Sequence, residues 1–216
     1  MIELRDVTKT FQGVNVVNDV TVSFEPGEIS GVIGRNGSGK TVLFKMICGL
    51  LRPTSGKVIV DDKVVGKDID FPESLGCIIE APGFLPYESG YQNLIDLASI
   101  RHRVNKQRIR EVMKIVALDW VGRKPVGKYS LGMKQRLGLA QAILENPDIL
   151  VLDEPMNGLD EQGVEIVRRL LLDLKEQGKT ILIASHNRED IDILCDKVYR
   201  MRDGQLREEK LPNGNP

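Results

Sequence analysis

The chain has 216 residues, and its 30 Lys and Arg side chains against 31 Asp and Glu give a formal net charge of −1. With 41% hydrophobic and 28% charged residues it can bury a sizeable core, which excludes a largely disordered chain. A charge balance this close to neutral lacks the basic surface typical of duplex-binding proteins, so nucleic acid is not an expected partner.

The sequence also argues against a membrane protein and against a disulfide-stabilised one. No apolar run reaches about 18 residues, and the first six residues lack the layout of a signal peptide, so the chain is expected to stay in the cytoplasm. The three cysteines, Cys48, Cys77 and Cys195, are widely spaced and odd in number. They predict reduced and mostly buried thiols, with neither a disulfide framework nor a zinc site.

The first third of the chain is predicted to be rich in strands. Residues 2–7 and 20–24 alternate apolar and polar side chains, and a Pro26-Gly27 turn precedes an apolar strand over 29–33. A helix is expected over 41–50, stopping at Gly49, and a turn then leads into a strand over 57–61.

The middle of the chain is predicted to be helical, and the last third alternates strands and helices. Helices are expected over 91–100 and 106–118, and a further one begins at Ser130 and ends before Pro147. Wholly apolar runs at 149–152 and 180–184 predict parallel strands covered on both faces. Residues 211–216 are expected to form a frayed tail.

Residues 34–41 read GRNGSGKT and match the phosphate-binding pattern G-x-x-x-x-G-K-[ST] between a predicted strand and a predicted helix. The glycines let backbone N–H groups curl around phosphate oxygens at a helix N-terminus. Lys40 is expected to reach the β and γ phosphates, and the Thr41 hydroxyl is expected to ligate Mg²⁺. The other predicted contacts to the nucleotide come from Gly34, Asn36, Gly37, Ser38 and Gly39.

Two carboxylates follow the predicted strand at 149–152, where open α/β sheets bind ligands. Asp153 is expected to hold Mg²⁺, and Glu154 is expected to take a proton from the water that attacks the γ-phosphate. Successive strand side chains point to opposite faces, so both can serve one site only if the chain turns here, and Pro155 favours such a turn.

Further along the chain, residues 128–136 read KYSLGMKQR, and Ser130 suits a helix N-cap. The order of the phosphate loop, Ser130-Leu131-Gly132, Asp153-Glu154 and Ser185-His186 resembles the ATP-binding cassette (ABC) ATPases over nearly the whole chain. The resemblance implies an α/β fold with a P-loop NTPase core, a mostly parallel sheet, an N-terminal antiparallel β-subdomain and an inserted α-helical subdomain. It implies one nucleotide-binding domain over 1–210, with the helical insertion at about 84–145.

The resemblance also implies roles for individual residues. Phe11 stands where the family has an aromatic that stacks on adenine, and His186 matches a histidine that contacts the γ-phosphate. Ser130 and Gly132 match the signature that contacts ATP held by the opposite subunit, and Asp160 matches the acidic position of a loop at the dimer interface. The implied partners are a second nucleotide-binding subunit and integral membrane permease subunits, which would place the chain on the inner face of the cell membrane.

This sequence departs from the family pattern at three positions. Leu131 and Met133 stand where the family signature usually has Gly and Gln. Glu80 stands where the family usually has Gln, and as an anion it is expected to ligate Mg²⁺ or its waters. Glu80 together with the 128–136 segment resembles ATPase subunits of bacterial antimicrobial-peptide exporters of the lantibiotic-immunity and bacitracin-resistance type.

Two other function classes stay open. One is an ABC ATPase that remodels a protein or nucleic-acid complex and transports nothing. The other is a P-loop GTPase or small-molecule kinase, although Asn105-Lys106-Gln107-Arg108 lacks the Asp of the base-reading N-K-x-D motif.

The aromatic residues of the helical region are also ambiguous. Phe84, Tyr87 and Tyr91 either line a groove for a partner helix or pack the junction between core and insertion. Trp120 is expected to pack inside the insertion.

Overall fold

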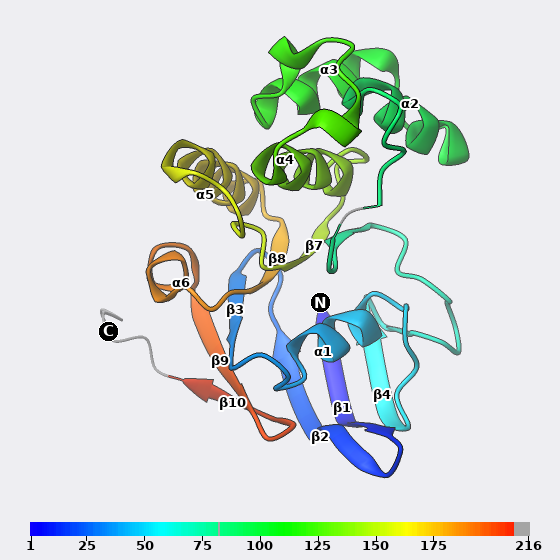
Figure 1. Cartoon of the computed structure of the whole chain (residues 1–216). Helices are drawn as coiled ribbons and strands as arrows, with labels where there is room; N and C mark the ends of the chain where they lie inside the picture. Colours follow the sequence, from blue (N-terminus) through cyan, green and yellow to red (C-terminus); the bar gives the residue numbers. More distant parts are fainter. Residues whose placement is uncertain (82, 210–216) are drawn as a thin grey trace.

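In the computed structural model, which describes residues 1–81 and 83–209, the chain folds into two β-sheets and six α-helices (Figure 1). The tail predicted at 211–216 lies outside the described residues. Within the described ranges, none of the helices combines the length and the apolar character needed to span a lipid bilayer.

The smaller sheet is antiparallel and has the strand order β2-β1-β4-β5. Its strands are β1 (Ile2–Phe11), β2 (Val14–Phe24), β4 (Ser55–Val60) and β5 (Lys63–Val64). The β1–β2 hairpin is longer than the sequence predicted, because Phe11 pairs with Val14 across a two-residue turn. Gln12 (φ +47°) and Gly13 (φ +82°) both lie in the left-handed region, as a tight hairpin turn requires.

The larger sheet has six strands in the order β10-β9-β3-β8-β7-β6. They are β3 (Ile29–Ile33), β6 (Leu75–Ile78), β7 (Ile149–Asp153), β8 (Thr180–Ala184), β9 (Lys197–Arg202) and β10 (Gln205–Glu209). All neighbouring pairs are parallel except β9 and β10. The predicted α/β fold with a mostly parallel sheet and an antiparallel β-subdomain is therefore confirmed.

The central strands of this sheet are apolar on both faces because each face packs against a separate core. Along β7, Ile149 and Val151 join the core that contains α1 and the antiparallel strands, whereas Leu150 and Leu152 join the core beneath the other helices. Side chains of a strand point alternately to its two faces, so a strand covered on both sides has no polar positions. This explains the unbroken apolar runs seen in the sequence.

The helices lie on both sides of the parallel sheet and at one end of the molecule (Figure 1). They are α1 (Lys40–Ile47), α2 (Gly90–Arg101), α3 (Lys106–Ile115), α4 (Leu131–Ala142), α5 (Glu161–Glu176) and α6 (Arg188–Leu194). Figure 1 shows α2, α3 and α4 grouped together, away from the antiparallel strands. In the chain these three helices come between β6 and β7.

Two expectations for the helical region need correction. The helix predicted over 106–118 ends at Ile115, and Ala117 adopts a left-handed backbone (φ +52°). Trp120 does not pack inside: its side chain is 69% exposed, and its ring N–H donates to the Ala117 carbonyl oxygen. A large apolar residue in a short turn can satisfy its polar atom locally and remain at the surface, so its apolar character does not by itself predict burial.

The three cysteines are unpaired thiols, as predicted: Cys48 and Cys195 are buried and Cys77 is half-buried. Burial raises the pKa of Cys195 to about 12, so this thiol is not a reactive thiolate at neutral pH. The ambiguity over the aromatic residues divides by residue. Phe84 and Tyr91 pack against the core beneath the helices, whereas Tyr87 is exposed.

Candidate functional site

The predicted phosphate loop runs from the end of β3 to the start of α1, and its glycines make this close turn possible. Gly37 (φ +79°) and Gly39 (φ +109°) have backbone conformations that other residues avoid. Gly39 also caps α1, and a Cβ there would lie 2.5 Å from the Val16 carbonyl oxygen of β2. Only glycine therefore lets the loop pass this close to the neighbouring strand.

Two side chains of the loop are suited to bind an anion. Lys40 is buried, and its Nζ donates to the carbonyl oxygens of Gly34 (2.7 Å) and Arg35 (3.3 Å), which holds the ammonium group against the loop. The Ser38 hydroxyl is buried, and no described residue hydrogen-bonds to it. Buried polar atoms are normally satisfied, so an unpaired hydroxyl in a loop of this shape fits a phosphate ligand.

A cavity of about 310 Å³ opens over the loop and reaches the carboxylates at the end of β7. Its lining comprises Val16, Asn36, Gly37, Ser38, Gly39, Lys40, Thr41, Val42, Asp153 and Glu154. Within it the Thr41 hydroxyl donates to Asp153 Oδ2 at 2.6 Å. The structure thus brings together the hydroxyl and the carboxylate that the sequence assigned to Mg²⁺.

The turn that the two carboxylates needed is present at Glu154. Its φ is +50°, and its backbone N–H donates to the Ala184 carbonyl oxygen of β8 at 2.9 Å. The Glu154 carboxylate lies 2.8 Å from His186 Nδ1, so the predicted base and the histidine predicted to contact the γ-phosphate are in direct contact. His186 follows β8, which is the strand beside β7, so parallel neighbours present both side chains at one edge of the sheet.

Gln135 is a residue at this site that the sequence analysis missed. It is buried on α4, and its Nε2 donates to the carbonyl oxygens of Glu154 (3.1 Å) and Pro155 (3.2 Å). These bonds hold the turn that orients the Glu154 side chain. The available signal was a polar residue at a buried helical position, because such a residue must have a partner.

A second cavity of about 330 Å³ contains the other group of predicted residues. It is lined by Ser130, Leu131, Gly132, Arg136, Gly158 and Asp160, and it shares no residue with the cavity over the phosphate loop. Ser130 caps α4 by accepting from the Met133 N–H (3.2 Å), and Asp160 caps α5 by accepting from the Gly163 N–H (2.8 Å).

Leu131 joins these two helix ends, and its side chain is 65% exposed. A Cβ built on Gly158 would lie 2.4 Å from Leu131 Cδ2, which shows how closely the leucine covers the loop before α5. The residues that line this second cavity, which we call the signature patch, are apart from the phosphate loop within one chain.

Four predicted site residues line neither cavity: Gly34 at the start of the phosphate loop, His186 beside Glu154, Phe11 and Glu80. Phe11, at the end of β1, is 43% exposed, and the Lys9 ammonium lies 5.1 Å from its ring centroid. Glu80 follows β6 and forms an ion pair with Lys45 of α1, with Oε1 2.7 Å from Nζ. Lys45 is a second residue that the sequence analysis missed.

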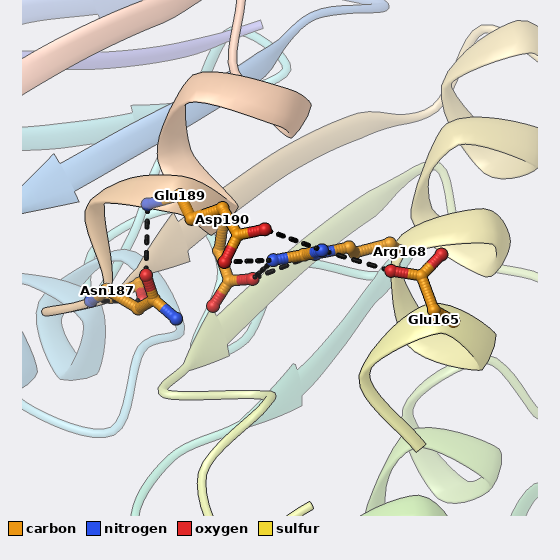
Figure 2. Close-up of polar contacts among 6 residues, drawn as sticks. Glu165, Arg168, Asn187, Glu189 and Asp190 are labelled. Atoms are coloured by element: carbon orange, nitrogen blue, oxygen red, sulfur yellow. Dashed lines mark hydrogen bonds and ion pairs between the residues drawn. The ribbon is translucent and has the colours of Figure 1, made fainter. Parts of the chain in front are cut away.

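A charged cluster joins the two helices that begin beside the site (Figure 2). From α5, Arg168 donates through Nε (2.9 Å) and Nη2 (2.6 Å) to Asp190 of α6, and it also contacts Glu165 and Glu189. Asp190 is 1% exposed, so this is a nearly buried charge pair. Asn187 follows His186 directly and caps α6. The Arg168–Asp190 pair therefore fixes the helix that follows the loop with His186.

Comparison with known proteins identifies the family. A sequence model described as ABC transporter matches residues 17–157, which include the phosphate loop, Ser130, Gly132 and both carboxylates. The chain belongs to the ABC transporter family.

The relatives of this ABC ATPase cover almost all of its length. An uncharacterised ABC transporter ATP-binding protein of Bacillus subtilis, YybJ, is 44% identical over 95% of this chain and 94% of its own. The bacitracin transport ATP-binding protein BcrA of Bacillus licheniformis is 41% identical over 97% of this chain and 69% of its own. The lantibiotic transport ATP-binding protein SrtF of Streptococcus pyogenes is 32% identical over all of this chain and 93% of its own.

A solved structure extends the likeness to the fold and the reaction. The ATP-binding cassette MJ0796, described as dimeric in a post-hydrolysis state bound to ADP and Pi, has a TM-score of 0.89 and 25% identity. The alignment covers 99% of this chain and 100% of that one. The chain is an ATPase and the ATP-binding subunit of an ABC transporter, as the resemblance implied, and the GTPase and kinase alternatives are excluded.

Proposed function

We propose that this ABC ATPase hydrolyses Mg²⁺-bound ATP between two nucleotide-binding subunits and drives export of a peptide antibiotic through separate membrane subunits. The observation that carries the catalytic part is the contact of Glu154 with His186 beside the phosphate-loop cavity. A carboxylate oriented by a second group at the end of a buried strand is suited to accept a proton from water.

The residues of the first cavity and His186 beside it have separate roles. Lys40, Ser38 and the loop N–H groups bind the phosphates, and Glu154 accepts the proton of the attacking water while His186 holds the carboxylate and faces the γ-phosphate. In the described residues no cluster of three or more His, Cys, Asp or Glu could hold a metal. That fits Mg²⁺, which takes few protein ligands and keeps phosphate and water oxygens.

Thr41 and Asp153, already in contact, would hold the ion, and Glu80 would reach it or its waters. When bound, Mg²⁺ neutralises charge on the phosphate oxygens.

The separate signature patch supports a site shared between two chains. Ser130 and Gly132 sit at the N-terminus of α4, and Asp160 sits at that of α5. Helix N-termini stabilise anions, yet this patch lines its own cavity and not the one over the phosphate loop. A partner chain whose nucleotide faced Ser130 would complete both sites, and the MJ0796 relative is described as a dimer. We place Phe11 beside the adenine in this arrangement.

The transported substrate follows from the relatives and not from the site. One of them is named for transport of bacitracin and another for transport of lantibiotics, and these substrates are peptide antibiotics. We propose one nucleotide-binding domain over 1–210 with its helical insertion at about 84–145. It would lie in the cytoplasm, bound to permease subunits at the inner face of the membrane, with no role for nucleic acid.

Two measurements on the native protein test this proposal. We expect the chain to copurify with an integral membrane protein, and we expect its deletion to sensitise the cells to bacitracin-type or lantibiotic peptides. Wild-type chain should restore resistance, whereas Lys40→Ala and Glu154→Gln should not. Copurification with only non-membrane proteins and unchanged sensitivity would contradict the proposed permease partners and the proposed substrate.

A further inference from the structure

One face of α1 holds two carboxylates, one helical turn apart. The Thr41 hydroxyl donates to Asp153 Oδ2 at 2.6 Å, and Lys45 Nζ lies 2.7 Å from Glu80 Oε1. Thr41 and Lys45 are four residues apart, so they share a face of the helix. Glu80 is therefore held about one turn away from the pair that would bind Mg²⁺.

The two carboxylates also come from neighbouring strands. Ile78 of β6 pairs with Leu152 of β7 in a parallel register, so the chain leaves both strands at the same edge of the sheet. Neighbouring strands lie about 4.8 Å apart. Glu80 and Asp153 thus reach the same side of α1, where Asp153 contacts Thr41 and Glu80 contacts Lys45.

The ion pair of Glu80 lies at the surface of the molecule. The Glu80 side chain is 65% exposed and that of Lys45 is 31% exposed. Exposed ion pairs contribute little to stability, so a competing cation can displace the lysine at low cost. Mg²⁺ is such a cation, because it prefers carboxylate oxygens and carries twice the charge.

We propose that Lys45 is a positioning residue that holds the Glu80 carboxylate on α1 and competes with Mg²⁺ for it. The proposal rests on the proposed Mg²⁺-dependent nucleotide binding and adds a residue to it. A neutral Gln at this position would need no counter-ion, whereas the Glu of this chain has one. Lys45 then sets the Mg²⁺ concentration at which the Glu80 carboxylate exchanges the lysine for the metal.

A Mg²⁺ titration of nucleotide binding tests the proposal without measuring hydrolysis. The full chain is mixed with a fluorescent, non-hydrolysable ATP analogue, and the Mg²⁺ concentration at half-saturation is measured for the wild type, Lys45→Gln, Glu80→Gln and the double variant. We expect Lys45→Gln to lower the half-saturating Mg²⁺ concentration about two- to fivefold while Glu80 is present. In the Glu80→Gln background the same substitution should have a clearly smaller effect.

Two further variants serve as matched controls. Lys45→Arg retains the charge and the pairing, so it should keep the wild-type value within about twofold. Lys114→Gln makes the same charge change on α3, which Figure 1 shows far from α1, and it should leave the titration unchanged. Thermal unfolding of each variant checks that the fold is retained.

Equal shifts in the two backgrounds would overturn the proposal, because they would show only direct repulsion between Lys45 and the metal. No shift, or weaker Mg²⁺ binding in Lys45→Gln, would also overturn it. These results leave Mg²⁺-dependent nucleotide binding intact in the wild type. A wild type that bound the analogue without any Mg²⁺ dependence would instead refute the proposed function and this inference together.

Discussion

At the scale of single residues, the site depends on backbone conformations that place a carboxylate and an imidazole in contact. The left-handed turn at Glu154 (φ +50°) redirects its carboxylate toward His186 Nδ1, which lies 2.8 Å away. Gln135 holds this turn through two hydrogen bonds to backbone carbonyls. Loss of the Glu154 carboxylate should therefore lower the rate of hydrolysis far more than it lowers nucleotide affinity.

We predict that Glu154→Gln lowers kcat by about 10²- to 10⁴-fold, because the amide retains the shape of the side chain and cannot accept the proton. Nucleotide affinity should change by less than about threefold, since the phosphate loop is intact. Steady-state ATPase assays and nucleotide titrations measure the two effects separately. Glu176→Gln, an exposed residue at the end of α5, is the matched control. Unchanged turnover in Glu154→Gln would show that another group is the base.

Two glycines of the phosphate loop should differ in how much unfolding free energy their replacement by alanine costs. Gly37→Ala should cost about 1–2 kcal/mol of unfolding free energy, from backbone strain alone, because nothing lies within 4 Å of its Cβ position. Gly39→Ala should cost more and weaken nucleotide binding, because its Cβ would meet the Val16 carbonyl oxygen at 2.5 Å. Chemical denaturation measures both variants. Equal losses of unfolding free energy in the two variants would mean that β2 shifts to make room for the new Cβ at no measurable cost.

At the scale of elements, α5 and α6 are joined by the buried Arg168–Asp190 pair that Figure 2 shows. The cap of α5 is Asp160, which lines the second cavity, and α6 begins two residues after His186. Removing one charge of a buried pair leaves the other uncompensated, whereas replacing both with apolar residues is often tolerated.

We therefore predict that Arg168→Met lowers the unfolding free energy by about 3–5 kcal/mol, because Asp190 is left buried and unpaired. The double variant Arg168→Met with Asp190→Leu should recover most of this loss. Arg169→Met, on the exposed side of α5, is the control and should change stability by less than about 0.5 kcal/mol. A double variant as unstable as Arg168→Met would show that the pair is not what joins the helices.

A second contact between elements ties together the starts of three strands. Asp148 accepts from the Ser74 hydroxyl at 2.7 Å and pairs with Lys179 Nζ at 3.0 Å, and these residues precede β7, β6 and β8. The hydrogen bond from Ser74, and then the contact with Lys179, hold the pKa of the Asp148 carboxyl below its usual range. The group therefore stabilises the fold above its unfolded pKa of about 4, and this contribution is lost as the pH falls through the lower folded pKa.

We predict that Asp148→Asn is less stable than the wild type at pH 7 and that the difference narrows as the pH falls below about 4. Denaturation curves recorded from pH 7 to pH 2 measure this. Asp62→Asn, an exposed aspartate in the turn between β4 and β5, should keep the wild-type pH dependence. A difference that stayed constant over this range would contradict the assignment.

At the scale of the whole molecule, most of the fold was predictable because its patterns are local. The apolar runs of β7 and β8 and the glycine loop before α1 each occupy a few consecutive residues, and the structure has them where predicted. What sequence reasoning missed depends on distant partners. Gln135 contacts the chain 19 and 20 residues away, and Lys45 meets Glu80 across 35 residues. No local pattern marks such pairs.

The site residues of one chain form two separate groups. The phosphate loop and the signature patch line different cavities in one chain, and each has what the other lacks. The chain carries both halves, so two copies can form two complete sites. A site shared in this way predicts that defects in different halves complement each other.

The most direct test mixes Lys40→Ala, which damages the phosphate loop, with Ser130→Arg, which blocks the signature patch. Neither variant alone should hydrolyse ATP. Both should remain folded, although Ser130→Arg loses the helix cap and with it about 1 kcal/mol of unfolding free energy. An equal mixture should regain about a quarter of wild-type ATPase activity, because half of random dimers are mixed and each mixed dimer has one intact site of two. Mixtures that form dimers yet stay inactive would contradict the shared site.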